Sequence, residues 1–378
     1  MRVFSFFMSV SFTCLLTAGA VHGQAPAGNT PADKDVLVGK DGEKLIGQME
    51  HADGTSVVFK SDVAGEVTIE WAKIQELRSA GKFAVIPKGA KLRSKEDEAN
   101  VPRGTVTATD QQIAVNTGTQ PAPAPVPVGN VANVVAQPAF EGAFVRQGFF
   151  KGWNGGLTGA IALITSTQKS QTYTGAVNLV RAVPNENWID LRSRTTIEFN
   201  GAYGKISQPL TPTVKTSLSH FALEQDWYLK PRLFVFGEGI LDHNFAQGLK
   251  LQQDYGAGLG FVVLKSDVQE FDVKVSANYI DQRFEVSGFD KTLFGTVFGE
   301  TYTRKFAHGI LFNEQGGFTP TWNDTSAYSA FVGAGLTFPV YHRFGLTMGA
   351  LDNYLNDPPP GFRKNSFQFT AGATYSLR

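Results

Sequence analysis

The chain has 378 residues, of which 12% are aromatic and 40 are glycine, and its formal net charge at pH 7 is zero. This neutral balance gives no electrostatic reason to expect nucleic acid as a partner. The length is sufficient for two domains, and the composition is typical of an all-β chain.

The first residues have the pattern of a secretory signal. Arg2 provides a positive start, an apolar stretch follows around residues 10–16, and small residues precede Gln24. This apolar stretch is too short to cross a bilayer as a helix. We therefore predict a signal peptide over residues 1–23 and a flexible leader over residues 24–34.

The only cysteine, Cys14, lies inside the predicted signal peptide. The exported chain is therefore expected to carry no thiol, no disulfide and no cysteine-based metal site, and no cofactor is predicted. Elsewhere no run of about 18 apolar residues occurs, so any membrane span is expected to consist of strands.

Residues 35–117 are predicted to form a small all-β periplasmic module. The turn signals Lys40-Asp41-Gly42 and Asp53-Gly54 separate short runs with strand character. The expected strands cover residues 36–38, 44–49, 56–60, 66–71, 83–86, 105–107 and 112–115. The series DVLVGKDGEKLIGQM, TSVVFKS and VTIEWAKIQEL resembles an SH3-like or Sm-like barrel. Two interpretations stay open: a structural module, or one that binds cell-wall glycan or a periplasmic partner protein.

A change of composition marks the boundary between this module and the rest of the chain. In the stretch GTQPAPAPVPVGN, prolines occupy every second place from Pro121 to Pro127. Proline cannot donate to a strand ladder and favours an extended polyproline conformation. We predict a linker over residues 118–143.

Residues 144–378 are predicted to form an antiparallel up-and-down barrel. Twelve short runs after Trp153 alternate apolar with polar residues, and the last, SFQFTAGATYSLR, does so without a break. Alternate residues of a strand lie on opposite faces. A soluble barrel and a membrane barrel both show this pattern, with inside and outside exchanged.

The predicted connections differ in length at the two ends of the barrel. Short ones are expected at residues 183–188, 230–232, 265–269, 307–309 and 339–342. Longer ones are expected at residues 203–215, 242–248, 285–291 and 353–365. Outer-membrane barrels show this difference and keep both termini on the short-turn, periplasmic side. This requires an even number of strands; we predict twelve, and ten or fourteen stay open.

The side chains on the two predicted faces indicate that lipid lies outside. Two aromatic rings are expected on the apolar face, at the short-turn ends (Trp153, Trp188, Trp227, Phe271, Tyr375) and at the long-loop ends (Tyr173, Phe221, Tyr279, Phe367). Bilayer interfaces favour such rings. The opposite face carries charged residues that a dry core would have to pair completely: Arg192, Arg194, Glu198, Glu224, Asp226, Asp254, Asp272 and Lys274.

Two features of the polar face lead to further expectations. The strand order predicts that Arg192 and Arg194 meet Glu224 and Asp226 inside the barrel, near its periplasmic mouth. Two strands fit the pattern poorly because their aromatic and charged residues share a parity. These are the strands that contain Phe234, Phe236 and Glu238, and Phe294, Phe298 and Glu300. Either a bulge resets each strand, or the aromatic side chains fill the lumen.

The segment FALEQDWYLKPRLFVFGEG, followed by DYGAGLGFVVL, resembles the YdiY-like family of salt-induced outer-membrane proteins, a family of unknown function. The matching positions are Glu224, Asp226, Trp227, Tyr228, Arg232, Leu233, Tyr255, Gly256, Gly258, Leu259 and Gly260. The resemblance covers roughly residues 150–378. The chain departs from the family in its first hairpin, where residues 166–170 lack a Gly-Asn turn, and its end has Arg378 in place of the terminal aromatic residue that is common in outer-membrane proteins. The resemblance implies an outer-membrane location and brings no established activity.

Three classes of function are compatible with these patterns. The first is a structural or weakly permeable barrel linked to envelope or salt stress, the second a narrow channel for small solutes, and the third an outer-membrane lipid hydrolase. A hydrolase needs a serine, a histidine and an orienting polar group. His220 lies close to Ser217 and Ser219 in sequence, and His243 lies beside Asp242 and Asn244. His220 shares the luminal parity of Glu224, away from lipid.

We therefore predict a non-enzymatic barrel with no catalytic, cofactor-binding or metal-binding residues. His308 and His342 are expected at turns, without matched metal spacing. The expected partners are outer-membrane lipid, the barrel-assembly machinery during insertion, and a periplasmic or cell-wall partner of the module.

Overall fold

The computed structural model describes residues 34–92, 95–118, 121–145, 148–165, 169–186, 188–207 and 212–377. The expected signal peptide, the leader up to residue 33, residues 166–168 of the first hairpin and Arg378 lie outside these residues. Among the helices described, none is long and apolar enough to cross a membrane.

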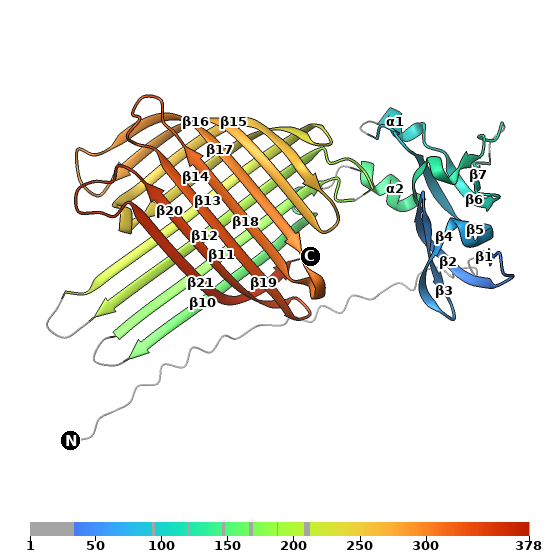
Figure 1. Cartoon of the computed structure of the whole chain (residues 1–378), viewed down its shortest axis with the longest axis horizontal. Coiled ribbons are helices and arrows are strands. Elements are labelled where there is room, and N and C mark those ends of the chain that lie inside the picture. Colours follow the sequence, from blue (N-terminus) through green and yellow to red (C-terminus); the bar gives the residue numbers. More distant parts are fainter. Residues whose placement is uncertain are drawn as a thin grey trace, which may run out of the picture.

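The carboxy-terminal part of the chain is a closed barrel in which each strand pairs with the next in antiparallel fashion (Figure 1). Its strands are β10 (Trp153–Thr165), β11 (Lys169–Val183), β12 (Ser193–Ser207), β13 (Val214–Lys230), β14 (Leu233–Asn244), β15 (Leu249–Lys265), β16 (Gln269–Phe284), β17 (Lys291–Lys305), β18 (Leu311–Thr319), β19 (Ser329–Tyr341), β20 (Phe344–Leu355) and β21 (Asn365–Leu377). The prediction of twelve up-and-down strands is confirmed.

The seam between the first and last strands is short. Residues Gly155–Gly159 of β10 pair with Ala373–Leu377 of β21, whereas β10 pairs with β11 along its whole length. The hairpins β10–β11 and β12–β13 extend beyond the rest of the wall at the end of the barrel that lies away from the amino-terminal module (Figure 1).

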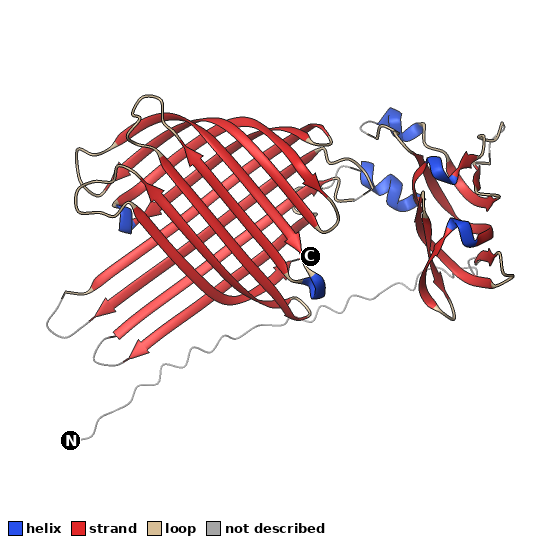
Figure 2. Cartoon of the chain, viewed as in Figure 1, coloured by secondary structure: helices blue, strands red, loops and turns tan. Residues whose placement is uncertain are grey.

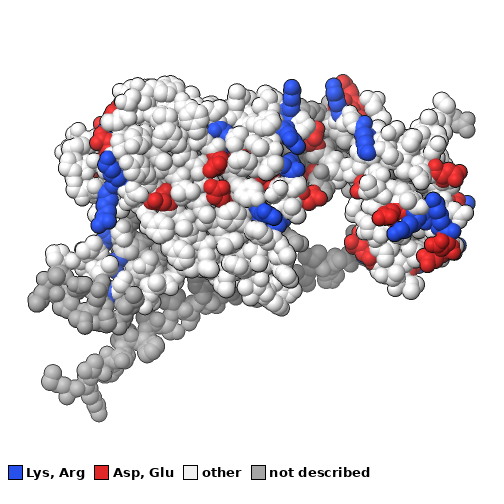
Figure 3. All heavy atoms as spheres, viewed as in Figure 1, with Lys and Arg blue, Asp and Glu red and all other residues white. Residues whose placement is uncertain are grey.

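The large exposed apolar side chains of the barrel lie mainly on its outer face, and buried carboxylates lie inside; Glu300, Glu314 and Asp352 are exceptions that share the outer face. On β21, Phe367 and Phe369 are 69% and 62% exposed, whereas the luminal Asp226 and Asp272 are 0% and 3% exposed. On the face drawn in Figure 3, most Lys and Arg side chains lie toward the two ends of the barrel. This inverted arrangement is that of a membrane barrel, since lipid solvates the apolar face and the polar face is enclosed.

The difference between the two ends of the barrel is also confirmed. At the end that holds both barrel termini, residues 231–232, 266–268 and 342–343 connect successive strands, whereas residues 285–290, 320–328 and 356–364 do so at the other end. The β11–β12 connection, residues 184–192, is an exception because it is long although it lies at the short-turn end.

Nine strands form the sheet of the amino-terminal module, in the order β4-β3-β2-β1-β5-β6-β7-β8, with β9 paired to both β2 and β5. They are β1 (Asp35–Gly39), β2 (Lys44–Asp53), β3 (Ser56–Ser61), β4 (Gly65–Glu70), β5 (Ile74–Pro87), β6 (Arg103–Thr109), β7 (Gln112–Asn116), β8 (Val126–Pro127) and β9 (Val131–Ala136). Strands β1, β2, β9 and β5 close a small four-stranded ring. Its core includes Phe59, Leu77 and Val134, which are 0–1% exposed.

The described residues also form short helices (Figure 2): η1 (Trp71–Lys73), α1 (Lys95–Ala99), η2 (Val128–Asn130), α2 (Gln137–Phe144), η3 (Phe245–Gln247) and η4 (Ala307–Gly309). Both α-helices precede the barrel strands in the chain.

The predicted linker over residues 118–143 is wrong from Val126 onward. Val126 and Pro127 pair with β7 at the edge of the sheet, where a proline without an N–H is tolerated. The run VANVVA then forms β9, which closes the ring of the module. This strand was not predicted because its apolar run is only six residues long and begins soon after the alternating prolines. The other expected domain boundaries stay predictions.

Helix α2 packs against both the module and the β11–β12 loop of the barrel. Phe140 is 0% exposed and its ring stacks on Trp188 at 5.9 Å between centroids. Ile189 and Trp188 belong to one apolar cluster with Ile86 and Val135 of the module. The prediction that Trp188 lies in the short-turn aromatic ring is therefore wrong, because β12 begins only at Ser193 and leaves Trp188 to pack against α2.

We expect this apolar junction to protect the chain between module and barrel from protease. Trp188 is partly buried against Phe140, so Trp188→Ala removes one side of this contact and should open the junction. Limited trypsin digestion of the folded protein should then cut at Lys151 several-fold faster than in the unchanged protein. The control is Trp322→Ala, because Trp322 is 59% exposed and lies in the β18–β19 loop. Equal cleavage rates for Trp188→Ala and the unchanged protein would contradict a protective junction.

Candidate functional site: the charged lumen

Arg194 on β12 is the centre of an ionic network inside the barrel. Its Nε donates to Asp226 Oδ2 at 2.7 Å, its Nη1 to Glu270 Oε1 at 2.8 Å and its Nη2 to Asp272 Oδ2 at 2.8 Å. Asp226 lies on the neighbouring strand β13, whereas Glu270 and Asp272 lie on β16, four strands away. The guanidinium group therefore links β12 and β13 to β16 across the interior of the barrel.

Aromatic side chains surround this network. The Arg194 guanidinium lies over the rings of Phe234 and Tyr228, at 5.5 and 5.9 Å from their centroids. Phe234 and Phe236 are 0% and 3% exposed. Of the two explanations for the poor pattern of β14, lumen filling is therefore correct. These rings exclude water from the ion pairs and strengthen them, because charge interactions are less screened in such surroundings.

In strand β17, unlike β14, the aromatic side chains lie on the outer face of the barrel. Phe294 and Phe298 are 47% and 53% exposed on the outer face, and Glu300 shares that face nearer the short-turn end. The expectation that the charges of β17 mark its luminal face is wrong. The aromatic rings determine the orientation because they gain most from contact with lipid.

A second group of polar contacts lies beside the first. Lys274 Nζ donates to Glu224 Oε2 at 2.6 Å, and Asn278 donates to Asp254 at 2.6 Å and to Glu238 at 3.1 Å. All these bonds join strands β13, β14 and β15 to β16.

Two glycines of the family motif make room for these side chains. A Cβ atom on Gly260 would lie 2.1 Å from the Phe234 ring, and one on Gly256 would lie 2.4 Å from the Asn278 amide. At both positions the close packing of luminal side chains therefore requires glycine.

One hydrogen bond crosses the full width of the barrel. Gln315 Nε2 donates to Glu198 Oε1 at 3.4 Å. Glu198 lies on β12 and Gln315 on β18, the third and ninth of twelve strands, so the two strands stand opposite each other. Side chains from facing walls therefore meet in the lumen.

The predicted luminal cluster of Arg192, Arg194, Glu224 and Asp226 is correct only in part. Arg194 and Asp226 meet as predicted. Arg192 instead donates to the carbonyl oxygen of Ala143 at 3.2 Å and lies over the Phe144 ring, because it precedes the first residue of β12. Glu224 pairs with Lys274, a partner that strand order alone could not indicate because β13 and β16 are not neighbours.

Loops fold over the long-loop end of the barrel. Gln247 in η3, between β14 and β15, donates to the carbonyl oxygens of Asn353 at 2.9 Å and Lys364 at 2.7 Å. Asn353 lies on β20 and Lys364 just before β21, on the opposite side of the barrel. Gly248 allows this approach, since a Cβ atom there would lie 2.8 Å from the Phe362 ring.

A salt-bridge clamp holds two further loops at this end. Lys291 Nζ lies 2.9 Å from Asp324 Oδ2 and 2.5 Å from Asp357 Oδ2. Hydrogen bonds from the Ser326 hydroxyl and from Lys291 lower the pKa of Asp324 below its usual value. A lowered pKa keeps this carboxylate ionised, and the clamp intact, as the medium becomes mildly acidic.

The histidines considered as catalytic candidates form two separate pairs. Ser217 Oγ lies 2.7 Å from His243 Nε2, and His220 Nδ1 lies 2.7 Å from Asp242 Oδ1. Ser217 and His243 share the outer face of the wall, whereas His220 and Asp242 share the luminal face. The other ring nitrogen of His243 faces the carbonyl oxygen of Lys250 at 2.9 Å. Asp242, the carboxylate next to His243 in the sequence, contacts His220 instead. Asp242 therefore does not complete a catalytic triad with Ser217 and His243.

We expect Ser217 to be unreactive. A carbonyl oxygen fixes the His243 tautomer but stabilises an imidazolium far less than a carboxylate does, so His243 should be a poor general base. A fluorophosphonate probe added to the folded barrel should therefore leave Ser217 unlabelled, as measured by mass spectrometry of its peptide. Labelling that disappears in both Ser217→Ala and His243→Ala, and persists in His220→Ala, would contradict this and favour the hydrolase.

We expect Arg194 and its acids to stabilise the barrel as a unit. Removing one partner of a buried ion pair costs about 3–5 kcal/mol, so Arg194→Ala should lower the heat stability of the folded barrel in a gel-shift assay. Adding Asp226→Ala should restore part of that loss, because one unpaired buried carboxylate is then removed. Arg283→Ala is the control, since Arg283 is 53% exposed. Strictly additive losses in the double variant would show that the two residues are not coupled.

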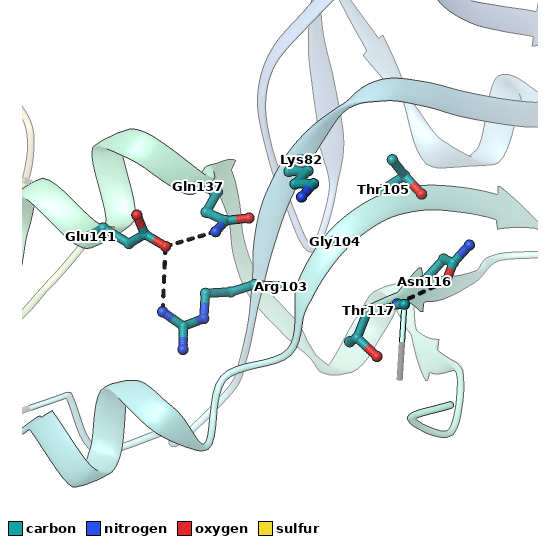
Figure 4. Close-up of a pocket in the computed structure, with 9 residues that line it drawn as sticks. Lys82, Arg103, Gly104, Thr105, Asn116, Thr117, Gln137 and Glu141 are labelled. Carbon is teal, nitrogen blue, oxygen red and sulfur yellow. Dashed lines mark hydrogen bonds and ion pairs between the residues drawn. The ribbon is translucent and has the colours of Figure 1, made fainter. Parts of the chain in front are cut away.

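The module carries a separate polar pocket of about 540 Å³, lined mainly by residues of β5, β6, β7 and α2 (Figure 4). Arg103 reaches into it and is held by Glu98 at 3.3 Å and Glu141 at 3.6 Å. Gln137 also donates to Glu141, at 2.7 Å. Lys82 also lines the pocket, so its two cations, Lys82 and Arg103, stand against the two carboxylates of Glu98 and Glu141 and leave no net positive charge for an anion.

Residues 160–377, more than half of the chain, match the family described as "Protein of unknown function, DUF481". The chain belongs to this family. The matched range covers nearly the whole barrel and excludes the module, as the sequence motifs predicted. The narrower YdiY-like name and the link to salt stay predictions. No curated protein matches the chain.

Several solved outer-membrane structures are distantly similar to the chain. The β domain of the Bordetella autotransporter BrkA shares 11% identity over 60% of this chain and 98% of its own, with a TM-score of 0.30. The translocator domain of the autotransporter NalP from Neisseria meningitidis shares 10% identity over 59% and 87%, with a TM-score of 0.31. OccK11 from Pseudomonas aeruginosa shares 7% identity over 60% and 94%, with a TM-score of 0.23. Similarities this distant carry no argument about function.

Proposed function

We propose that this DUF481 protein is a non-enzymatic outer-membrane barrel whose lumen is closed to all but very small solutes. Its role is structural or weakly permeable, and the sequence resemblance connects it with envelope or salt stress. The observation that carries the proposal is the Glu198–Gln315 contact between opposite strands, together with the Arg194 network that links β12 to β16.

The proposed orientation follows from the ends of the barrel. The first and last barrel strands begin and end at the short-turn side, where the module is attached through α2. Outer-membrane barrels place this side in the periplasm. The predicted signal peptide supports export, and the closed loops at the other end would then face the medium.

The charges of the lumen favour a cation-selective leak as the second candidate. The luminal acids named above are Glu198, Glu224, Asp226, Glu238, Asp242, Asp254, Glu270 and Asp272, against the cations Arg194 and Lys274. An excess of carboxylates along a narrow path attracts cations and repels anions. A narrow channel would therefore conduct cations.

Planar-bilayer recording of the purified full chain tests the proposal. The unchanged protein should show no stable single-channel steps, whereas Arg194→Ala should produce small cation-selective steps because it removes the side chain that links β12 to β16 across the lumen. Arg283→Ala, outside the lumen, is the matched control and should stay silent. Stable steps from the unchanged protein would overturn the closed-lumen proposal in favour of the channel.

The proposed partners follow from the parts of the molecule. Outer-membrane lipid surrounds the apolar wall, and the barrel-assembly machinery inserts it. A periplasmic or cell-wall partner of the module stays a proposal, supported by the open polar pocket beside Arg103.

A further inference from the structure

Three lysines gather on the outer face near the tips of the first two hairpins. Lys205 on β12 lies directly opposite Lys215 on β13, and Lys169 on β11 is opposite Ser207, two residues beyond Lys205. Side chains directly opposite on one sheet face have Cβ atoms about 4.5–5.5 Å apart, and diagonal neighbours lie about 7–8 Å apart. The three ammonium groups can therefore reach one common ligand.

The outward direction of these lysines follows from the register. Tyr173 and Tyr203 pair with each other and are 42% and 40% exposed on the outer face. Lys205 is two residues beyond Tyr203, and successive even steps along a strand keep one face. Ser217, opposite Tyr203, is likewise two residues from Lys215.

No acidic residue balances this lysine patch. The sequence contains no Asp or Glu in residues 152–185 or 199–223, which include both hairpin tips. Elsewhere at the same end of the barrel, two cations each have two carboxylate partners: Arg283 with Asp281 and Asp290, and Lys291 with Asp324 and Asp357. Like charges directly opposite on a sheet are destabilising, so an unbalanced pair of lysines indicates an anion supplied from outside.

The depth of the patch indicates what the anion is. Exposed tyrosines mark the boundary between acyl chains and headgroups, and a two-residue step along a strand is about 7 Å. Lysine also keeps its stem against apolar surface and extends its charge outward. The three ammonium groups thus lie at the level of the phosphates of the outer leaflet.

We propose that Lys169, Lys205 and Lys215 form a binding site for the phosphate groups of an outer-leaflet glycolipid. The ligand chemistry is a phosphate monoester on an acylated sugar, held by ammonium groups while its acyl chains lie along the apolar wall below. The site goes beyond the proposed function, because it binds lipid whether or not the lumen conducts.

Native mass spectrometry of the folded full chain in zwitterionic detergent tests this site, with bis-phosphorylated lipid A as the probe. The unchanged protein should retain lipid A. The triple variant Lys169→Gln, Lys205→Gln, Lys215→Gln should bind it on the order of 100-fold more weakly, since each lysine near an anionic surface contributes about one tenfold step or slightly less. Raising the salt concentration should weaken binding by the unchanged protein as well.

The matched control is Lys230→Gln, Lys265→Gln, Lys305→Gln, which removes the same charge at the short-turn end of the barrel. This control should bind lipid A like the unchanged protein. Dephosphorylated lipid A should bind as weakly to the unchanged protein as lipid A does to the triple variant. The heat-dependent gel shift establishes that each variant is folded, and Lys205→Glu alone, with at least a tenfold loss expected, replaces the triple variant if that one does not fold.

Three results would overturn the proposal. They are equal binding of lipid A by the triple and unchanged proteins, equal loss in the control variant, and equal binding of phosphorylated and dephosphorylated lipid. Inorganic phosphate that displaces lipid A at comparable concentration would show a free-anion site and would also overturn the assignment to a lipid.

Discussion

The desolvated guanidinium group of Arg194 ties together strands of this barrel that are not neighbours in the wall. Backbone hydrogen bonds of a sheet join only neighbouring strands, so they close the wall but do not fix its shape in cross-section. Arg194 joins β12 to β16 through two carboxylates on one strand. A fork of donors in fixed geometry suits this task better than an ammonium group would, because it holds several acceptors at once.

The aromatic side chains of β14 and the glycines of β15 make this network possible. Phe234 fills the space beside the ion pairs, and Gly260 leaves that space free. Buried charges are costly unless they are paired and well packed, so the strand that seemed to break the alternation provides the packing that the charges need. These residues of the family motif therefore serve the packing of the lumen.

Much of the fold could be predicted from the sequence because strand alternation and loop length are local properties. They indicated twelve strands, the apolar outer face and the Arg194–Asp226 contact, which lies between neighbouring strands. The pairing of Arg194 with Asp272 and of Glu224 with Lys274 could not be predicted, since it depends on how the closed wall bends. Strand β9 was missed because its short apolar run follows prolines, and Trp188 because its partner Phe140 belongs to a helix of another unit.

The short seam between β10 and β21 has a consequence for how the barrel is made. Within the described part of the chain, Gly155–Gly159 and Ala373–Leu377 alone join the two ends of the wall, so most of the sheet can form before it closes. Every other neighbouring pair of barrel strands is contiguous in the chain and can form as a hairpin, whereas the seam brings together residues more than two hundred positions apart. Closure is therefore the last and least supported step of assembly. The same edge is where the finished wall would first separate if the molecule were pulled apart within the bilayer.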